Sequence, residues 1–587
     1  MRPSHRRPGL VALVVILLAG CGAPQPSTQP TSPSTISVSP SPTPSGSAPA
    51  PSASPSAAAY APAIGSVAVT VSDRIRVRSE PRVSDDSAKY EPVLPLGTGL
   101  FVLDGPISAS GYVWYKVAPV SFGGLEGPGF GWVAIADKDG QPWVGPATGP
   151  DTAISLALAD VPRAPAEPAD AKAAAASINA FGLDLERRLV TDGSLALRDR
   201  NVVFSPTSIV LALAMARAGA RGETAAQMDK VIHAAGWDNL AGGVNALDQA
   251  LTSRNAKWDD GDGPKELTLR LANAPFGQRG WTIDPAYLDA LASSFGAGLR
   301  SVDYVADPDA ARKTINAWVK DRTGGRIPEL LSGDDVTSTT RLMLVNAIYL
   351  KAQWATWFDD GATKTEPFTR QDGSRVAIPM MTRYGGMELP YAHGAGWQAT
   401  ELRYLSPNGV HQLAMTFILP KDLPTFEAGL TAAQLKQIVA AVATGPKSMD
   451  CPGVPADQQD AGCYAYDLIL SVPRFGIETR ANLNKLLIDL GMPLAFDAGA
   501  ADFSGIHTPG PLYIGTVVHQ ANIDVDEKGT EASAATAVGM DTGGGPSPVK
   551  DITLKLDHPF LFFVRDVDTG VVLFMGRVMD PSVPKGQ

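Results

Sequence analysis

Histidines and cysteines are the residues of this chain whose side chains most often carry nucleophilic, acid–base or metal chemistry. The seven histidines stand at positions 5, 233, 393, 411, 507, 519 and 558, and none falls in a HExxH zinc motif. The 587 residues contain no GxSxG elbow, GxxxxGK phosphate loop or dinucleotide fingerprint. The WDDGDG segment at residues 258–263 has carboxylates that suit calcium but lacks the remaining spaced ligands, so a solvated turn is favoured. We therefore expect no catalytic residue, no metal site and no cofactor.

Two of the three cysteines flank one polar insert. Cys451 and Cys463 close a short loop rich in proline and glycine, and in an exported protein such a pair most simply forms a disulfide. Zinc binding is less favoured because no histidine lies nearby in the sequence. Loop entropy limits the stabilisation from this bridge to about 3 kcal/mol.

The third cysteine, Cys21, follows an apolar stretch at residues 10–20, which is preceded by Arg2, Arg6 and Arg7. The stretch is too short to span a bilayer and has the charged start and apolar middle of a signal peptide. With Cys21 it resembles a bacterial lipoprotein box. This resemblance implies that residues 1–20 are removed, that the Cys21 thiol carries a lipid, and that the protein is exported and anchored to the membrane. An ordinary secretory signal with an incidental cysteine is the alternative.

Two biased segments separate the parts that can fold. Residues 21–63 consist almost wholly of Pro, Ser, Thr, Ala and Gln and cannot bury a core. In extended form at about 3.1 Å per residue they reach on the order of 120 Å, so we interpret them as a tether. A second linker, rich in Pro, Ala and Asp, is expected at residues 146–169.

Between these segments, residues 64–145 show short alternating apolar runs broken by glycines, a pattern typical of a small all-β barrel. The motifs RVRSEP, LGTG, WYKV and GWV resemble a bacterial SH3-like domain. This resemblance implies a cell-wall peptide or a protein as ligand. Tyr112, Trp114 and Trp132 either line a recognition groove or are buried aromatics of the barrel.

Length and charge limit the remaining classes. A chain of 587 residues is too long for one ordinary core, so two or more domains are expected. With 49 Lys plus Arg against 60 Asp plus Glu, the net charge of −11 argues against a general nucleic-acid binder. The hydrophobic content of 44% with 19% charged residues is typical of globular domains.

The run VDEKGTEASAATAVGM at residues 525–540 lies between strand patterns. Gly529 provides a swivel without a Cβ penalty, and the Ala, Ser and Thr side chains that follow are small enough to enter a crowded sheet. A mobile surface loop is the plain alternative. The residues permit a segment that leaves the surface and becomes a sheet strand.

From about residue 170 to residue 581, ordered motifs of the chain resemble the serpin family, the serine protease inhibitors. The matching segments are NVVFSPTSI (201–209), LVNAIYLKAQW (344–354), VPRF (472–475), DFSGI (502–506), VVHQANIDVDEKGTEASAATA (517–537), HPFLFFVRD (558–566) and LFMGRVMDP (573–581). The resemblance implies an α+β serpin domain at residues 170–583, with three β-sheets, eight or nine helices and a mobile reactive-centre loop. The native state would be metastable.

The resemblance also assigns roles to residues of this sequence. The reactive-loop hinge comprises Glu527, Lys528, Gly529, Thr530, Glu531, Ala532, Ser533, Ala534, Ala535 and Thr536. The shutter beneath the main sheet comprises Ser205, Ser208, Asn346 and His519. The breach, where insertion starts, comprises Trp354, Arg474 and Glu527. His519, flanked by valines, is thus expected to be a hydrogen-bonded core histidine rather than a catalyst.

The mechanism implied is suicide inhibition of a target serine protease, with a cysteine protease as a second target class. The protease cleaves the loop, and the hinge then inserts into the main sheet with the acyl-enzyme attached. Counting from Gly529 as in the family gives Gly543 as the scissile position, with Gly544 after it. Met540, followed by Asp541, suits a protease pocket better, so the bond is expected within residues 540–547.

A protein of another class is the rival hypothesis. In it the SH3-like domain recognises the cell wall or another protein, and the serpin domain is a non-inhibitory carrier. The glycine-rich tip at residues 543–545 keeps this alternative open. In either case we expect a monomer that binds no nucleic acid and meets the membrane only through the lipid on Cys21.

Overall fold

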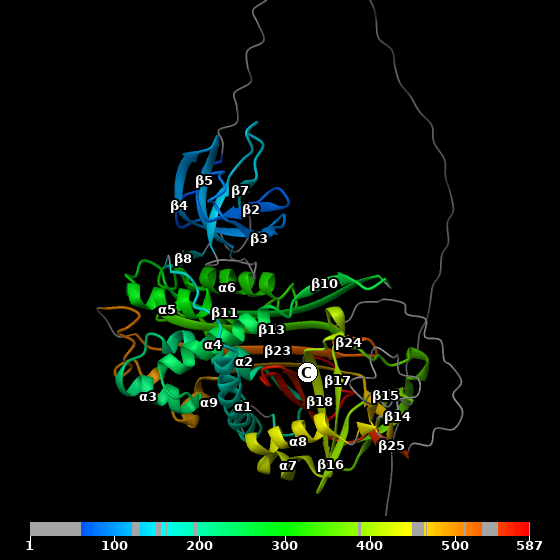
Figure 1. Ribbon diagram of the computed structural model, residues 1–587. Coiled ribbons are helices and arrows are strands. Elements are labelled where there is room, and N and C mark those ends of the chain that lie inside the picture. Colours follow the sequence, from blue (N-terminus) through cyan, green and yellow to red (C-terminus); the bar gives the residue numbers. More distant parts are fainter. Residues whose placement is uncertain are drawn as a thin grey trace, which may run out of the picture. The chain divides into compact units, whose positions relative to one another are not determined.

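The computed structural model of the protein describes most of residues 60–585 (Figure 1). The described ranges are 60–119, 130–147, 154–159, 161–192, 197–261, 263–384, 389–445, 447–448, 463–464, 466–508, 512–530 and 550–585. Among these residues, no helix is long and apolar enough to cross a membrane. The expected signal segment, Cys21 and the tether before residue 60 lie outside the described ranges.

Residues 67–146 form a seven-stranded antiparallel sheet in the order β3-β2-β6-β5-β4-β1-β7. More and less buried side chains alternate along β1 and β2, which is the period of two expected for a strand with one face on a core. The strands are β1 (Val67–Thr70), β2 (Ile75–Arg78), β3 (Lys89–Leu94), β4 (Gly99–Ala109), β5 (Tyr112–Pro119), β6 (Gly131–Ala134) and β7 (Val144–Pro146).

The aromatic residues of this sheet divide between core and surface. Trp114 and Trp132 are buried, and the indole nitrogen of Trp114 donates to the Ala109 carbonyl at 2.9 Å. Tyr112 is only partly buried and stacks on Trp143, with ring centroids 5.9 Å apart. Trp114 and Trp132 are therefore buried aromatics of the core, whereas Tyr112 and Trp143 form a stacked pair that is partly exposed.

An eight-stranded sheet is the centre of the remaining chain. Its order is β22-β23-β24-β13-β11-β12-β8, and β10 pairs with β11 beside that path. Its strands are β8 (Ser155–Ala157), β10 (Ala256–Asp259), β11 (Pro264–Gln278), β12 (Leu299–Val302), β13 (Leu342–Gln353), β22 (Phe475–Asn482), β23 (Thr516–Val525) and β24 (Gly529–Thr530). Residues 155–157, expected in a linker, thus pair with β12 at the edge of this sheet.

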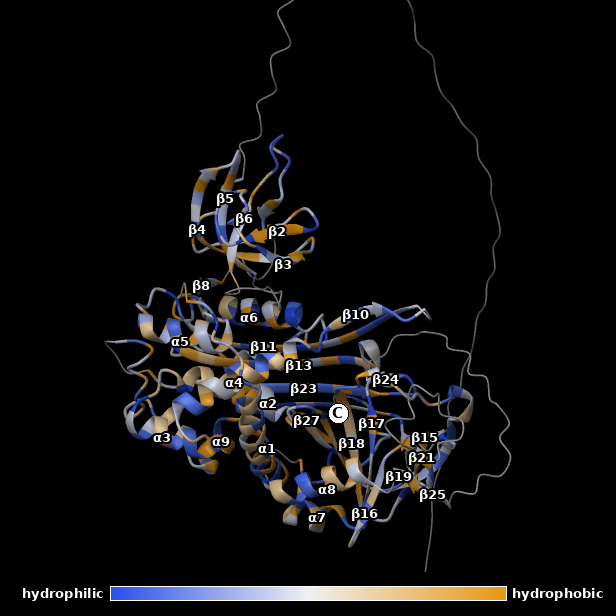
Figure 2. Cartoon of the chain, in the orientation of Figure 1, coloured by the Kyte–Doolittle hydropathy of each residue, from blue (hydrophilic) through white to orange (hydrophobic). Residues whose placement is uncertain are grey.

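Two further large sheets accompany it, and β18 and β27 of the second are buried along their whole length and consist mostly of hydrophobic residues (Figure 2). The four-stranded sheet contains β14 (Lys364–Thr369), β15 (Arg375–Arg383), β21 (Tyr466–Pro473) and β25 (Lys550–Lys555). The six-stranded sheet contains β16 (Tyr391–Gly394), β17 (Trp397–Arg403), β18 (Leu413–Pro420), β26 (Phe560–Asp566), β27 (Val572–Val578) and β9 (Val202–Phe204). A short pair, β19 (Lys447–Ser448) and β20 (Cys463–Tyr464), lies apart from them in the topology.

Nine α-helices occur in the described residues, and side-chain caps fix where several begin. Ser205 accepts a hydrogen bond from the Ser208 amide at the start of α2, and Asp307 accepts one from the Ala310 amide at the start of α6. The helices are α1 (Pro168–Thr191), α2 (Pro206–Arg217), α3 (Gly222–Val231), α4 (Trp237–Thr252), α5 (Pro285–Phe295), α6 (Pro308–Arg322), α7 (Leu423–Gly429), α8 (Ala432–Thr444) and α9 (Asn484–Leu490).

The eight-stranded sheet is covered on both faces. Figure 1 shows α2 on one side of it and α6 on the other. Along β23, Val517, Ala521 and Ile523 belong to the larger core with α2, whereas Val518 belongs to a smaller core with α6. The three large sheets and the mixed α and β composition confirm the fold class expected for the serpin part.

Candidate functional site

The centre of the eight-stranded sheet contains a seam between β13 and β23. These parallel strands pair from Met343 with Thr516 to Ile348 with Ala521, where their pairing ends. Beyond that point β13 still pairs with β11, and β23 still pairs with β22. The seam is thus closed at one end. Towards its other end, β13 stays paired with β11 and β23 stays paired with β22.

The other end of the seam is occupied by β24. Thr530 pairs with Ala352 of β13 and with Val525 of β23, antiparallel to both. The Trp354 amide donates to the Lys528 carbonyl at 2.8 Å, and the Asp526 amide donates to the Gly529 carbonyl at 3.1 Å. The chain therefore turns back after β23 and enters the sheet between the two strands that must separate if the seam opens.

Gly529 is required by a close approach of two backbones. A Cβ atom on this residue would lie 2.2 Å from the Ala352 carbonyl oxygen, a distance at which one of the strands must shift. Its φ of 156° also falls in the range that other residues avoid. Glycine thus lets the chain reach the position from which Thr530 joins both strands.

Two aromatic side chains cover the entry of β24. Trp354 is 1% exposed and stacks on Tyr404, with ring centroids 4.5 Å apart and planes at 19°. The Trp354 indole nitrogen donates to the Asp526 carbonyl at 3.0 Å. The Tyr404 hydroxyl lies 2.7 Å from the hydroxyl of Thr530, which is also 1% exposed. Thr530 is therefore held in the core by one side-chain hydrogen bond and two strand neighbours.

Glu527 anchors the turn before β24. Its carboxylate accepts hydrogen bonds from the Arg474 guanidinium at 2.5 Å and from the Thr363 hydroxyl at 2.7 Å. Burial alone would raise the pKa of Glu527, but the bonds from Thr363 and Arg474 outweigh it and hold this pKa below its usual value. Glu527 is thus ionised at neutral pH, and the turn is fixed to Arg474, between β21 and β22, and to the segment before β14.

A polar cluster lies beneath the closed part of the seam. The Ser205 amide donates to His519 Nε2 at 3.0 Å, so Nδ1 carries the proton that His519 donates to Asn346 Oδ1. Ser208 donates from its hydroxyl to Asn273 Oδ1 at 2.9 Å. These contacts join α2 to β11, β13 and β23, and they cross the seam through the pair formed by His519 and Asn346.

His519 is neutral in this environment. Its side chain is fully enclosed, and burial lowers its pKa to about 3 because the imidazolium would lose its hydration. The Nδ2 atom of Asn346 is buried without a hydrogen-bond partner in the described structure. The closed seam thus contains one unsatisfied donor, which makes it less stable than a fully paired arrangement.

Comparisons with known proteins agree with this architecture. A family model described as Serpin (serine protease inhibitor) matches residues 176–581. This chain belongs to the serpin family. An uncharacterized serpin-like protein of Thermococcus kodakarensis is 36% identical over 410 residues, covering 69% of this chain and 85% of that protein. The leukocyte elastase inhibitor of Bos taurus is 35% identical over 383 residues, with 65% and 93% covered, and that of Homo sapiens is 33% identical over 400 residues, with 67% and 98% covered.

Solved structures show the same fold. The crystal structure of the thermophilic serpin tengpin in its native state matches with a TM-score of 0.59 and 24% identity, covering 72% of this chain and 99% of that chain. The structure of maspin matches with a TM-score of 0.57 and 21% identity, covering 70% of this chain and 100% of that chain. At these identities the likeness extends to the fold alone.

The structure of this serpin brings several of the predicted residues together. Trp354, Arg474 and Glu527 surround the entry of β24, and Ser205, Asn346 and His519 form one hydrogen-bonded cluster. Ser208 joins that cluster through Ser205, whose hydroxyl accepts from the Ser208 amide at 3.1 Å. Of the hinge, the four residues Glu527, Lys528, Gly529 and Thr530 are described.

The other predicted positions lie outside the described residues. They are the hinge residues Glu531, Ala532, Ser533, Ala534, Ala535 and Thr536, the scissile-bond candidates Met540, Asp541, Gly543 and Gly544, and Cys21 and Cys451. Cys463 is in β20, but its side chain is not among those described. The disulfide and the scissile bond therefore stay predictions.

Three residues of this serpin's sheet centre are not foreseen from its sequence. Tyr404 bonds Thr530, Thr363 bonds Glu527, and Asn273 bonds Ser208. Each is a single polar residue in an otherwise ordinary strand or loop, and no local pattern distinguishes it. In the described part of the chain, no three His, Cys, Asp or Glu side chains are grouped as a metal site would need.

Proposed function

We propose that this serpin inhibits a serine protease by suicide cleavage of its reactive-centre loop and covalent trapping of the acyl-enzyme. The observation that carries the proposal is the position of β24. Gly529 and Thr530 already lie antiparallel between β13 and β23, the arrangement that an entering strand must adopt. The loop that follows needs only to extend this strand into the seam.

The chemistry belongs to the target enzyme. Its serine Oγ attacks the carbonyl carbon of the scissile bond, the peptide C–N bond breaks, and the new amino group leaves with a proton from the enzyme's histidine. An ester then joins the protease to the part of the loop that begins at Thr530. Hydrolysis of this ester by water would release a cleaved serpin, so trapping depends on insertion that is faster than hydrolysis.

Insertion would carry the protease across the molecule. A strand rises about 3.3 Å per residue, so a dozen inserted residues would move the attached enzyme by roughly 40 Å. Thr530 faces the core, and alternation then directs Ala532, Ala534 and Thr536 to the same face. These small side chains enter the core without overpacking, whereas Glu531 falls on the opposite face.

We also propose the class of the target protease, which we infer from the residues at the tip of the loop. Met540 suits the pocket of an elastase-like, chymotrypsin-like or subtilisin-like protease, and the counted position Gly543 offers no side chain. The leukocyte elastase inhibitors among the relatives support testing elastase-like enzymes first.

The test is incubation of the full chain with elastase, chymotrypsin, subtilisin and trypsin, followed by denaturing gel electrophoresis. We expect an SDS-stable complex with at least one of them, and none when its active-site serine is blocked beforehand. Mass spectrometry of the released peptide locates the scissile bond within residues 540–547. Loop cleavage by every protease without any complex would refute inhibition and favour a non-inhibitory carrier.

We further propose that the protein is exported and anchored through a lipid on Cys21. The short apolar stretch before Cys21 and the Pro-, Ser- and Thr-rich segment after it support this proposal. Labelling with a fatty-acid analogue should mark the full chain and should not mark Cys21→Ser. Equal labelling of both would contradict lipidation at this residue.

The N-terminal sheet is proposed to be an SH3-like recognition domain for a cell-wall peptide or a protein. Tyr112 and Trp143 support it, because a partly exposed stacked pair offers an aromatic surface to a ligand. Binding of the full chain to purified peptidoglycan, compared with Tyr112→Ala, tests the cell-wall ligand. Cys451 and Cys463 are proposed to form a disulfide, which equal thiol labelling with and without reductant would exclude.

A further inference from the structure

Helix α6 is attached to one side of the seam. Its Ile315, Trp318 and Val319 are buried in the smaller core, and the Trp318 ring packs edge-on against Phe276 of β11, with centroids 5.3 Å apart. Val345 of β13 belongs to the same core. β11 and β13 are paired neighbours, so α6 is based mainly on the half of the sheet that ends at β13.

The chain that follows α6, residues 324–337, is bound to the other half of the sheet, and we call it the crossing segment. From β22, Arg480 donates through Nε to the Leu330 carbonyl at 2.7 Å and forms an ion pair with Asp335. From β23, Asn522 donates to the Arg326 carbonyl at 3.2 Å. The crossing segment therefore bridges the seam between β13 and β23.

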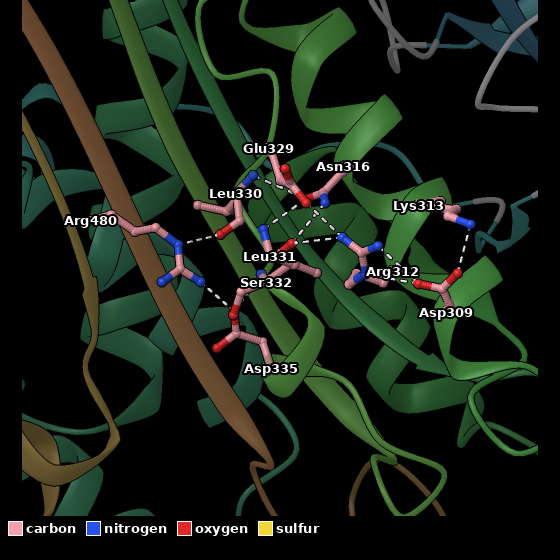
Figure 3. A network of polar contacts seen from close by, with 10 residues as sticks. All are labelled: Asp309, Arg312, Lys313, Asn316, Glu329, Leu330, Leu331, Ser332, Asp335 and Arg480. Atoms are coloured by element: carbon pink, nitrogen blue, oxygen red, sulfur yellow. Dashed lines mark hydrogen bonds and ion pairs between the residues drawn. The ribbon is translucent and has the colours of Figure 1, made fainter. Parts of the chain in front are cut away.

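The attachment of the crossing segment to α6 is strong (Figure 3). Asn316 of α6 is 6% exposed, and its Oδ1 accepts from the amides of Leu330 and Leu331 at 3.0 and 2.8 Å. Its Nδ2 donates to the Leu331 carbonyl at 2.9 Å. Arg312 adds an ion pair with Glu329 at 2.7 Å. The segment is thus joined to the helix by three hydrogen bonds of the buried Asn316 side chain.

The attachment to β22 is more open to solvent. The Arg480 side chain is 35% exposed, whereas its partner Asp335 is 9% exposed. Arg480 nevertheless holds both the Leu330 carbonyl and the Asp335 carboxylate, and Figure 3 shows it reaching the crossing segment from the strand side, opposite Arg312. The bonds of Arg480 that cross the seam are thus charge-assisted.

A new strand in the seam would break this bridge. Neighbouring strands lie about 4.8 Å apart, so an inserted strand moves β22 and β23 away from β13 by that amount. A hydrogen bond is broken when its donor and its acceptor stay attached to two elements that move apart by this distance. The crossing segment stays with α6 through Asn316, and therefore the bonds of Arg480 must be released.

We propose that Arg480 acts as a clamp that holds the crossing segment over the closed seam and limits the rate at which the loop inserts. Arg480 is a positioning residue, because it acts through its bonds to the crossing segment, and the proposal rests on the inhibitory function proposed above. Loss of the clamp speeds insertion, and it also lets the sheet accept a strand before any protease has cleaved the loop.

The experiment measures strand entry without a protease. A synthetic peptide of residues 530–538 (TEASAATAV) is added in excess to the full chain, and its entry is followed by native gel shift and by the rise in the thermal unfolding midpoint. Because Arg480 makes a charge-assisted hydrogen bond and an ion pair, Arg480→Ala should take up the peptide about tenfold faster than the wild type. Arg480→Lys keeps a charge opposite Asp335 and should show an intermediate rate.

Arg312→Ala is the matched control, because it removes an arginine of the same network whose bonds join α6 to the crossing segment and not to β22. Its peptide uptake should stay within about twofold of the wild type, since it leaves the charged bonds across the seam in place. Hydrogen exchange at Leu330 and Leu331 should stay slow in Arg480→Ala, because Asn316 still holds both amides. Acceleration by Arg312→Ala equal to that of Arg480→Ala would overturn the proposal, since general loosening would then suffice.

The outcomes separate the clamp from the inhibitory function. Equal uptake by wild type and Arg480→Ala would overturn the clamp, even where the wild type traps a protease. Faster uptake by Arg480→Ala would support the clamp, even where no protease is trapped. Failure of every variant to accept the peptide, at temperatures up to the onset of unfolding, would overturn the clamp, whereas the inhibitory function is decided by the SDS-stable complex.

Discussion

At the residue scale, Thr530 is the described residue at which the proposed insertion of the loop begins. Its side chain faces the larger core, its hydroxyl bonds the Tyr404 hydroxyl at 2.7 Å, and its backbone pairs with β13 and β23. A residue at this position must fit a fully enclosed space before any later residue can follow. In the proposed mechanism, the side chain at position 530 is therefore the first that has to fit.

Replacing Thr530 with arginine should convert the inhibitor into a substrate. A guanidinium placed here is buried without a partner, and each 1.4 kcal/mol that this adds to the barrier slows insertion about tenfold. Hydrolysis of the acyl-enzyme is then faster than insertion, so gels should show the cleaved serpin in place of the SDS-stable complex. Lys528→Arg is the control, because that neighbouring side chain is only partly buried and keeps its charge. Unchanged trapping by Thr530→Arg would contradict this role.

His519 should make the stability of the closed sheet depend on pH. Its pKa is about 3 in the folded protein, below the value of about 6.5 in an unfolded chain. Between these values the unfolded state binds the extra proton, so the free energy of unfolding is highest above pH 6.5 and falls by up to about 1.4 kcal/mol per pH unit on acidification.

The measurement is the urea unfolding midpoint of the wild type and of His519→Gln between pH 7 and pH 4.5. The variant should be less stable at pH 7 and should lose less stability on acidification. His393→Gln, at an exposed position, should retain the wild-type slope. Parallel curves for wild type and His519→Gln would mean that His519 does not contribute to this dependence.

At the element scale, the two-residue strand β24 holds the seam open at one end and is itself held by few contacts. Its backbone pairs with two strands, while the stacked pair Trp354 and Tyr404 closes over it. The short length of β24 means that each of these contacts is a large part of its stability. The element is therefore poised to detach or to extend.

Tyr404→Phe should loosen β24 without disturbing the aromatic stack. The ring on Trp354 stays, but the buried Thr530 hydroxyl loses its partner, at a cost of about 1 kcal/mol. Hydrogen exchange over residues 526–530 should then become about fivefold faster. Tyr391→Phe removes a tyrosine hydroxyl that bonds Gln398 instead, and it should leave this exchange unchanged. Equal exchange in Tyr404→Phe and wild type would show that strand pairing alone holds β24.

The sequence predicts the elements of this site better than the contacts between them. Gly529 with its small neighbours, and His519 between valines, are local patterns, and in the described residues His519 is a buried, hydrogen-bonded histidine and Gly529 begins β24. Tyr404, Thr363 and Asn273 meet their partners across 126, 164 and 65 positions of the chain. Local periodicity has no information about such distant pairs, and the same holds for the bonds of Arg480 to the crossing segment.

At the scale of the whole molecule, the ordered motifs from residue 201 to residue 581 predict three sheets through the family resemblance that they carry, and their described parts lie in strands, in turns and at the start of α2. The N-terminal sheet is predicted only as a β pattern, and whether an aromatic residue is buried depends on tertiary packing. The sequence pattern around Trp114 and Trp132 is the same for a groove-lining and for a buried side chain, and both residues are buried. The sequence period gives the face of a strand but does not say what covers that face.

The intact loop is attached at both ends, and this restrains the whole molecule. It leaves the eight-stranded sheet at Thr530 and returns at β25, which pairs in parallel with β21 of the four-stranded sheet. A chain fixed at both points cannot extend β24 through the length of the seam. In the proposed mechanism, cleavage within residues 540–547 would free the arm that begins at Thr530, and the closed seam, with its unsatisfied Asn346 donor, would then have a more stable alternative.

Cleavage of the loop by a protease that is not trapped should therefore raise the thermal unfolding midpoint. About ten inserted residues at about 1 kcal/mol of net hydrogen bonding each add on the order of 10 kcal/mol. At about 2 °C per kcal/mol for a large domain, the midpoint should rise by about 20 °C in calorimetry at a fixed scan rate. Cleaved Thr530→Arg is the decisive comparison: its arm is free but cannot bury the guanidinium, so it should melt within a few degrees of the intact protein. A cleaved wild type that melts no hotter than the intact chain would mean that the freed arm does not enter the seam, because the tether at β25 is then gone.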